Sequence, residues 1–382
     1  MNGGVKLKKL KLSISILMLT FVLVACGSVD KTTTTKNTSG NGNQKTEITG
    51  QNSSKYYKTV LKNGKYQVSK SRGVSTQQNS NNFNLKSFDK GMLDISKKVF
   101  STDKYVFQEG QYISSERTQN WLGRYSKKNP SGLNPKKVKG KLVPEYIQQI
   151  NEQDYLVPVG KNLSLGGMTI GIGVNSIYYY QKEQYGATYE KKLTNDQIKY
   201  QGKLAAQKIL NRLRKNNKLK NIPIVFALYK QAPDDSLIGG NFYAYSVNKN
   251  GANKISSWNK VNQKKYVFPI ADGEKSPNSN DASSFNEFKS QVQNYFPNLS
   301  GITAQAQYND GALTGMHVNV NTQFYSQTEV TSFTQYLQTA AQKYLPANAP
   351  IDITVSSAQG VQSFLSRGSN DRSFTFHIFD SF

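Results

Sequence analysis

The sequence predicts an α+β protein made of two tandem copies of one helix-strand-strand-helix-strand-strand unit. Apolar residues recur at every third or fourth position in some segments, as in amphipathic helices, and alternate with polar residues in others, as in half-buried strands. Segments of these two kinds follow the same order twice along the chain. This order favours largely antiparallel sheets with helices packed on one face.

The first 25 residues have the pattern of a secretory leader that ends in a lipidation site. Four lysines precede an apolar run from Leu12 to Ala25, and the only cysteine of the chain, Cys26, follows it. A basic region, an apolar region and small residues at the cut form a signal peptide. Leu23-Val24-Ala25-Cys26 is then a lipobox, in which the Cys26 thiol receives diacylglycerol and the chain is cleaved after Ala25. The apolar run of 14 residues is too short for a membrane span, which needs about 20.

The lipobox determines the expected location and the first partners. We expect membrane lipid, attached through Cys26, and the lipoprotein-processing enzymes. The protein would then be exported and lipid-anchored at the outer face of the cytoplasmic membrane.

Residues 26–55 predict a disordered tether between this anchor and the folded part. They are rich in Thr, Asn, Gly and Ser, and Val29 and Ile48 are almost their only large apolar residues. Such a composition buries too little apolar surface to offset the loss of chain entropy on folding.

The first copy is predicted over residues 56–270. Asn63-Gly64 between two apolar segments predicts a hairpin. Residues 114–160 are polar, basic and interrupted by Gly and Pro, so we interpret them as an inserted loop region. The other predicted elements are a helix at 85–100, extended chain at 105–113, a strand at 168–172, a helix at 194–213 that starts with a capping box, and strands at 222–229 and 241–247.

The second copy is predicted over residues 281–382. A helix ends before Pro297, a second helix begins with a capping box from Ser326 to Glu329, and this helix stops before Pro346. Its predicted elements are helices at 285–295 and 326–344 and strands at 302–307, 316–320, 351–355 and 373–378.

Short matches between the copies support a duplication. Gly167-Met168 corresponds to Gly315-Met316, and an Ala-Ala-Gln-Lys segment occurs in one helix of each copy. The Gly-Met pairs are offset by 148 residues and the leading helices by 197, so the first copy has about 49 extra residues. The loop region 114–160 is where these residues fit.

Charge indicates the surfaces that the exported part meets. The net charge is +25, and removal of the four leader lysines leaves +21, spread along the chain. An exported protein does not normally meet nucleic acid, so we expect none as a partner. Anionic wall polymer or lipid headgroups are the expected counter-surface. The alternative is that the charge only maintains solubility.

The sequence contains no pattern that identifies catalysis. It has no nucleophile elbow, no His-Glu-x-x-His and no complete phosphate-binding glycine motif. We therefore expect no catalytic residues, metal site or cofactor. Glu109, Glu116, Arg117 and Trp121 lie close together where the inserted region starts, and charged and aromatic residues on a loop form a candidate binding surface. The structural alternative is an Arg–Glu pair under a packed Trp.

Two short segments carry a resemblance to a known family. Tyr66 to Gly73 reads Tyr-Gln-Val-Ser-Lys-Ser-Arg-Gly, and Phe107 to Tyr112 reads Phe-Gln-Glu-Gly-Gln-Tyr. With the lipobox, the polar tether and the two copies, the chain resembles the CamS sex-pheromone lipoproteins of Gram-positive bacteria. The resemblance covers essentially the whole mature chain.

The resemblance implies a second product from the leader. In that family the end of the signal peptide is trimmed to a short hydrophobic pheromone. The corresponding residues here are Leu19, Thr20, Phe21, Val22, Leu23, Val24 and Ala25. Phe21 and Leu23 fit the family pattern of an aromatic residue followed by leucine, whereas Leu19, Thr20 and Val24 depart from it. The resemblance implies no catalytic residues.

The combined interpretation is a membrane-anchored lipoprotein whose leader is a pheromone precursor and whose mature part is a non-enzymatic binding module. Two alternatives come from other classes of function. One is a cell-surface enzyme that acts on wall polymer, which would require converging carboxylates such as Asp103, Glu109 and Glu116 around a pocket. The other is a structural protein held at the wall by its charge.

Overall fold

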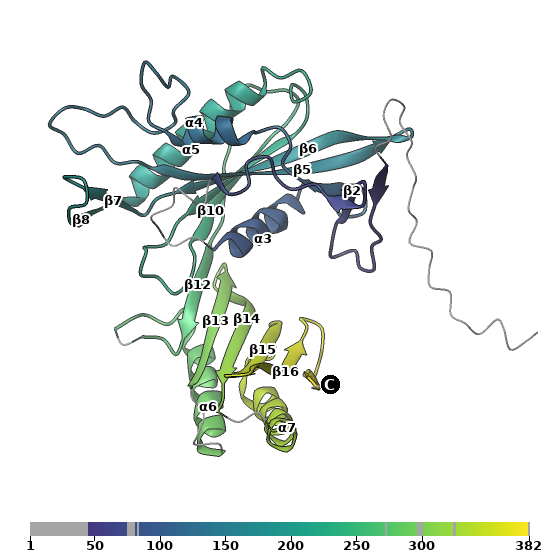
Figure 1. Ribbon diagram of the computed structural model, residues 1–382. Helices are drawn as coiled ribbons and strands as arrows, with labels where there is room; N and C mark the ends of the chain where they lie inside the picture. The colour runs from purple at the N-terminus through teal and green to yellow at the C-terminus, as the bar shows by residue number, and fades with distance from the viewer. Residues whose placement is uncertain are drawn as a thin grey trace, which may run out of the picture.

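The computed structural model describes residues 45–74, 81, 84–271, 273–295, 301–323 and 326–380. Two large sheets with helices against them form these parts, and a smaller hairpin projects from the first sheet (Figure 1). This arrangement confirms the predicted α+β class. The lipobox, the leader segment 19–25 and residues 26–44 of the predicted tether lie outside the described residues.

The boundary predicted for the tether at residue 55 is wrong. Strand β1 (Thr46–Ile48) pairs antiparallel with β2 (Lys58–Lys62), and Ile48 packs against the small apolar cluster around Val60. A single apolar residue in this polar segment is thus enough for a strand to form, because the neighbouring strand β2 supplies the backbone hydrogen bonds. The predicted hairpin is confirmed: β3 (Lys65–Tyr66) follows β2 through Asn63 and Gly64, both of which have positive φ.

The first sheet has the strand order β1-β2-β4-β5-β6-β9-β10-β11, with β3 beside β2. Neighbouring strands are antiparallel except for the parallel pairs β2–β4 and β6–β9. Its other strands are β4 (Val106–Glu109), β5 (Ile147–Val159), β6 (Asn162–Val174), β9 (Ile224–Lys230), β10 (Asn241–Asn248) and β11 (Asn259–Lys260). The helices around it are α3 (Leu85–Ser96), α4 (Ser115–Leu122) and α5 (Asn195–Leu213).

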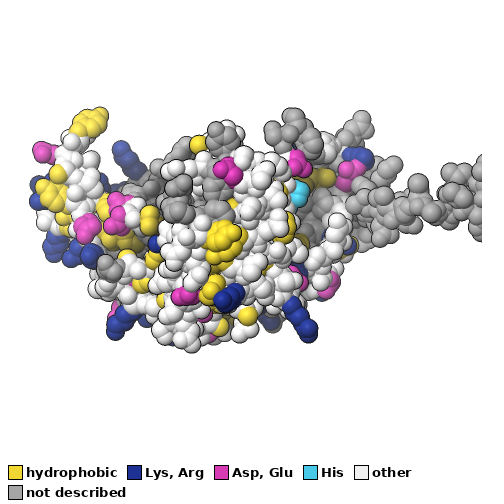
Figure 2. Space-filling view, turned by 90° about the horizontal axis from the view of Figure 1, so that it is seen from below, with side chains coloured by type: hydrophobic (Ala, Val, Ile, Leu, Met, Phe, Trp, Pro, Cys, Tyr) yellow, Lys and Arg dark blue, Asp and Glu magenta, His cyan; other side chains and the backbone are white. Residues whose placement is uncertain are grey.

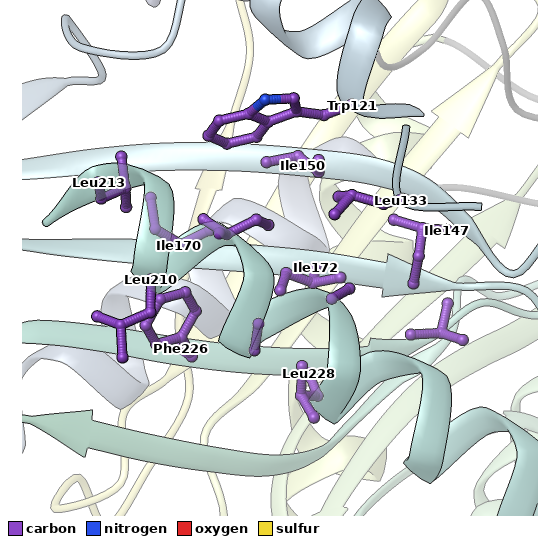
Figure 3. Packing of buried hydrophobic residues seen from close by; sticks show 14 of the residues in the cluster. Trp121, Leu133, Ile147, Ile150, Ile170, Ile172, Leu210, Leu213, Phe226 and Leu228 are labelled. Atoms are coloured by element: carbon purple, nitrogen blue, oxygen red, sulfur yellow. The ribbon is translucent and has the colours of Figure 1, made fainter. Parts of the chain in front are cut away.

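Helices cover both faces of this sheet, which differs from the predicted cover on one face. Helices α4 and α5 pack on the face that carries Ile170, Ile172 and Phe226 (Figure 3). Helix α3 lies on the opposite face, against Val225 and Tyr229 (Figure 1). Strand β9 is buried over six consecutive residues, the pattern of a strand that is covered on both sides.

A glycine brings α3 close to the sheet. A Cβ atom at Gly171 in β6 would lie 2.4 Å from the Met92 sulfur and 2.7 Å from the Phe88 ring, so only glycine leaves room for this helix. Gly171 thus allows close packing of α3 on β6.

The region predicted as an inserted loop, residues 114–160, contains two regular elements. Helix α4 starts at the Ser114 cap, and β5 is a 13-residue strand in the middle of the first sheet. The strand was missed because Gln149, Glu152, Gln153 and Asp154 are buried although they are polar. Its sequence therefore lacks the alternation of apolar and polar residues on which the prediction depended.

The second sheet has the strand order β12-β13-β14-β15-β16-β17, with one helical face. Helices α6 (Ser279–Tyr295) and α7 (Gln327–Tyr344) both pack on this face, as predicted. The structure adds two strands to the prediction. Strand β12 comes from residues that were assigned to the end of the first copy, and β16 lies between the two closing strands. The strands are β12 (Gln263–Phe268), β13 (Gly301–Asn309), β14 (Ala312–Asn321), β15 (Ile351–Ser357), β16 (Gly360–Arg367) and β17 (Thr375–Ile378).

Four strands of each sheet share one topology. In both β5-β6-β9-β10 and β13-β14-β15-β16 the outer pairs are antiparallel and the middle pair is parallel. The Met168 amide donates to the Pro223 carbonyl at 3.1 Å, and the Met316 amide donates to the Pro350 carbonyl at 3.0 Å. The leading helices differ, because α3 lies across the sheet from α5 whereas α6 and α7 share a face.

The hairpin of β7 (Ile177–Gln181) and β8 (Thr188–Lys192) forms a separate two-stranded sheet at the left of Figure 1. In the part of the chain that the structure describes, no helix is both long enough and apolar enough to span a membrane.

Candidate functional site

A pocket of about 230 Å³ lies at the edge of α3, where four segments meet. Leu85, Asp89 and Leu93 face it from the helix, at the four-residue spacing that places side chains on one stripe. Strands β4 and β5 contribute alternate residues, with Glu152 of β5 in addition, and the segment from Ser69 to Gly73 closes one side. The sequence thus builds the pocket from one helix stripe and two strand faces.

The two segments that carry the family resemblance contact each other at this pocket. The Ser69 amide donates to Glu109 Oε2 at 2.6 Å, and the Lys70 amide donates to the Gly110 carbonyl at 3.0 Å. The Arg72 guanidinium lies 3.6 Å from Glu109 Oε1 in an exposed ion pair. The Gln111 side chain also donates to the Val68 carbonyl at 2.9 Å. The two segments, residues 66–73 and 107–112, are far apart in sequence but contact each other as one structural unit.

A buried carboxylate holds the turn that follows β4. Glu152 accepts the backbone N–H groups of Gln111, Tyr112 and Ile113, at 2.7 Å from Ile113 and 2.9 Å from Tyr112. A Cβ atom at Gly110 would lie 2.4 Å from the Glu152 Cβ, so glycine is required for this approach. The Gln-Glu-Gly-Gln segment thus has a structural role.

Asp154 lies beside Glu152, and its carboxyl has the more strongly raised pKa of the two. Burial raises the pKa of Asp154 well above its usual value, and the neighbouring Glu152 charge raises it further. Burial also raises the pKa of Glu152, but hydrogen bonds from the Asp154 carboxyl and the three backbone amides oppose this rise. The environment thus disfavours the charged form of Asp154 more than that of Glu152.

Asp89 is the carboxylate that faces the pocket from α3. Burial raises its pKa, the Asn151 hydrogen bond lowers it, and the nearby Glu109 charge raises it. Asn151 Nδ2 donates to Asp89 Oδ1 at 2.9 Å, and Gln153 Nε2 donates to the Asp89 carbonyl at 3.1 Å. A partly buried acid held by two amides is a candidate ligand-binding group.

The structure separates the four residues of the predicted binding surface. Glu109 lines the pocket beside α3, whereas Arg117 and Trp121 line another pocket of about 430 Å³ beside α5. Trp121 is 4% exposed and packs in the core, with the Arg212 guanidinium 5.2 Å from its ring centre. Glu116 is exposed in the first turn of α4. These residues do not form one continuous site.

A second candidate surface lies on the β7–β8 hairpin. The rings of Tyr178, Tyr180 and Tyr189 stack in a row with successive centroids 5.7 Å apart. Lys182 Nζ lies 4.4 Å from the centre of the Tyr189 ring, and Lys191 pairs with Tyr178 across the strands. We call these five residues the tyrosine face. Figure 2 shows Lys and Arg side chains at several separate places on the surface in view, so basic residues are not confined to the hairpin.

The sequence interpretation missed Asp89 and the β5 side chains. A polar residue at 89 interrupts an apolar helix stripe between Leu85 and Leu93, which is a signal that was available. Gln149, Asn151 and Gln153 alternate along β5, but a run of polar residues predicts a loop unless its burial is known. Among the described residues, no group of three or more His, Cys, Asp or Glu side chains is placed to hold a metal ion.

Comparison with known proteins identifies similar structures. The family model of the CamS sex pheromone cAM373 precursor matches residues 66–373. The crystal structure of a sex pheromone precursor from Lactobacillus salivarius subsp. salivarius UCC118 is 48% identical, with a TM-score of 0.84, over 88% of this chain and 100% of that one. The C-terminal domain of the sex pheromone staph-cAM373 precursor from Staphylococcus aureus is 30% identical, with a TM-score of 0.67, over 78% and 96%. No curated protein sequence matches this chain.

Proposed function

This chain belongs to the CamS sex pheromone cAM373 precursor family, and we propose that it is an exported lipoprotein whose leader releases the peptide Leu19–Ala25. The observation that carries this proposal is the lipobox Leu23–Cys26, which lies at the end of an apolar run in a chain of this family. Cleavage after Ala25 gives the leader the same C-terminus as the proposed peptide. The mature part stays at the outer face of the membrane through lipid on Cys26.

Substitution of the lipidated residue tests the anchor. Cys26→Ser removes the thiol nucleophile, so we expect loss of metabolically incorporated fatty acid and of membrane retention. Ser28→Ala, two residues further along, is the matched control and should leave both unchanged. Fatty acid retained on the Cys26→Ser protein would contradict the anchor.

The mature part is proposed to be a non-enzymatic binding module. The pocket beside α3 supports this, because a partly buried acid, fixed amides and an apolar wall converge there. Binding at this pocket should be lost when Asp89 is changed, without loss of the fold.

We also propose that the tyrosine face contacts anionic wall polymer. Stacked Tyr rings offer flat apolar surface to sugar or polyol units, and Lys182 and Lys191 attract phosphate groups. Glu190 pairs with Tyr179 and lies on the other face of the hairpin, where it does not oppose this charge. Binding of the mature chain to a glycerol-phosphate polymer tests the contact, and Lys191→Glu should weaken it.

A cell-surface enzyme is the second candidate. The raised pKa of Asp89 favours it, because burial that raises the pKa of a carboxyl suits that group to act as a general acid. The arrangement first expected for an enzyme differs, since Glu109 lines the pocket while Asp103 and Glu116 do not. Release of wall fragments by the mature chain, abolished by Asp89→Asn, would support the enzyme over the binding module.

A further inference from the structure

A relay of side-chain amides leads to Asp89 and fixes the direction of each group. Gln149 Nε2 donates to Asn151 Oδ1, and Asn151 Nδ2 donates to Asp89 Oδ1 at 2.9 Å. Because the side-chain nitrogens of Gln149 and Asn151 both donate toward Asp89, the Gln149 side-chain oxygen takes no part in these hydrogen bonds. Gln149 lines the pocket, is fully buried, and its Oε1 has no hydrogen-bond partner in the described part of the chain. A buried acceptor of this kind calls for a donor.

The charged groups at the pocket favour a cation. The acids that line it beside this free acceptor are Asp89, Glu109 and Glu152, and Glu152 already accepts three backbone N–H groups. Arg72 is the cation at its rim. Arg72 is 60% exposed and lies near Glu109. Burial and the Glu109 charge raise the pKa of Asp89 more than the Arg72 charge lowers it. An N–H donor with a positive charge would satisfy both Asp89 and Gln149.

The size and wall of the pocket limit the ligand. Its volume of about 230 Å³ corresponds to about eight water molecules at ~30 Å³ each. Leu85, Leu93 and Phe107 form an apolar side beside the acids. A ligand of roughly eight non-hydrogen atoms with one cationic and one apolar end matches this shape.

We propose that this pocket binds the α-ammonium group and the adjoining apolar side chain of a free amino acid or of the first residue of a short peptide. Its ammonium group lies between Asp89 and Gln149 Oε1, and its apolar side chain packs against Leu85, Leu93 and Phe107. This inference rests on the proposed role of the mature part as a binding module. A free amino acid also presents a carboxylate, which Arg72 at the rim is placed to meet.

Three small probes test the ligand class on the full mature chain. L-leucinamide has the ammonium group, L-leucine adds a carboxylate, and N-acetyl-L-leucinamide lacks the positive charge. Titration calorimetry should show binding of the first two, and at least about tenfold weaker binding of the acetylated probe. Tighter binding of leucine than of leucinamide would identify free amino acids, and equal binding would indicate peptide N-termini.

A matched pair of variants locates the site. Asp89→Asn keeps the shape but removes the charge, so it should weaken leucinamide binding at least about tenfold. Asp94→Asn makes the same change on α3, where Asp94 pairs with Lys90 at the surface, and should leave binding unchanged. If Asp89→Asn impairs folding, the comparison of the acetylated and free probes on the unchanged protein still decides.

Three outcomes would overturn the inference: no leucinamide binding at about 10 mM, equal binding of the acetylated probe, or equal effects of Asp89→Asn and Asp94→Asn. None of them alters lipid attachment or peptide release, which the Cys26→Ser experiment measures separately. Failure of this inference is therefore distinguishable from failure of the proposed function.

Discussion

Glu152→Gln should destabilise the first sheet although it changes one atom. The carboxylate of Glu152 accepts the N–H groups of Gln111, Tyr112 and Ile113, and the residue is 4% exposed. A glutamine keeps one acceptor oxygen, but its other terminal atom is an NH2 group that donates and cannot accept. At least one of the three buried backbone N–H groups therefore loses its partner. An unsatisfied buried donor costs about 1–3 kcal/mol, and the lost charge weakens the remaining bonds. We expect a loss of about 2–4 kcal/mol in the free energy of unfolding.

Denaturant unfolding followed by tryptophan fluorescence measures this loss. The chain has two tryptophans, Trp121 and Trp258, and both pack on the core of the first sheet, so the signal reports the region that contains Glu152. Glu116→Gln is the control, because Glu116 is exposed and contributes at most the ~0.3–1 kcal/mol of a charge at a helix start. An equal loss in both variants would refute the role assigned to Glu152.

Three further predictions follow from the same contacts and charges. Gly110→Ala should destabilise the protein by about 1–3 kcal/mol in denaturant unfolding, because its Cβ would overlap Glu152, and an unchanged midpoint would contradict this. Burial raises the pKa of Asp154, so the protonated carboxyl contributes to the free energy of unfolding at low pH. This contribution is lost as the pH rises from the unfolded pKa of about 3.9 through the folded pKa. In unfolding curves measured across this pH range, Asp154→Asn should make the decrease in the free energy of unfolding less steep, by up to ~1.4 kcal/mol per pH unit. Binding of the mature chain to glycerol-phosphate polymer should weaken steeply in a salt titration, since exposed charges are screened within about 10 Å at 0.1 M, whereas salt-independent binding would contradict the tyrosine face.

Local signals in the sequence predicted the regular elements best. The capping box at Thr194 and Gln197 starts α5 as predicted, with both of its reciprocal hydrogen bonds present. Asn63-Gly64 similarly located its hairpin, because few residues other than glycine and asparagine accept positive φ. These signals depend only on residues near in sequence.

Features that depend on distant partners were not predicted. Strand β5 looks polar because Glu152 and Asp154 are buried where they meet a turn more than 35 residues earlier. Strand β1 forms because β2 supplies its hydrogen bonds. Helix α3 packs on the face opposite α4 and α5, where Gly171 leaves room for Met92. The pocket beside α3 is lined in part by α3 and β5, so Asp89 and the β5 residues were missed together.

The most direct test of the central claim is the response of plasmid-bearing donor cells to synthetic Leu19–Ala25. The proposed role predicts a response, and Phe21→Ala or Leu23→Ala in the peptide should reduce it about tenfold or more, since burial of each side chain contributes roughly 1.5–3 kcal/mol. Thr20→Ala, a change of a polar side chain, should have the smaller effect. A silent peptide beside active culture supernatant from the producing strain would assign the signal to another molecule.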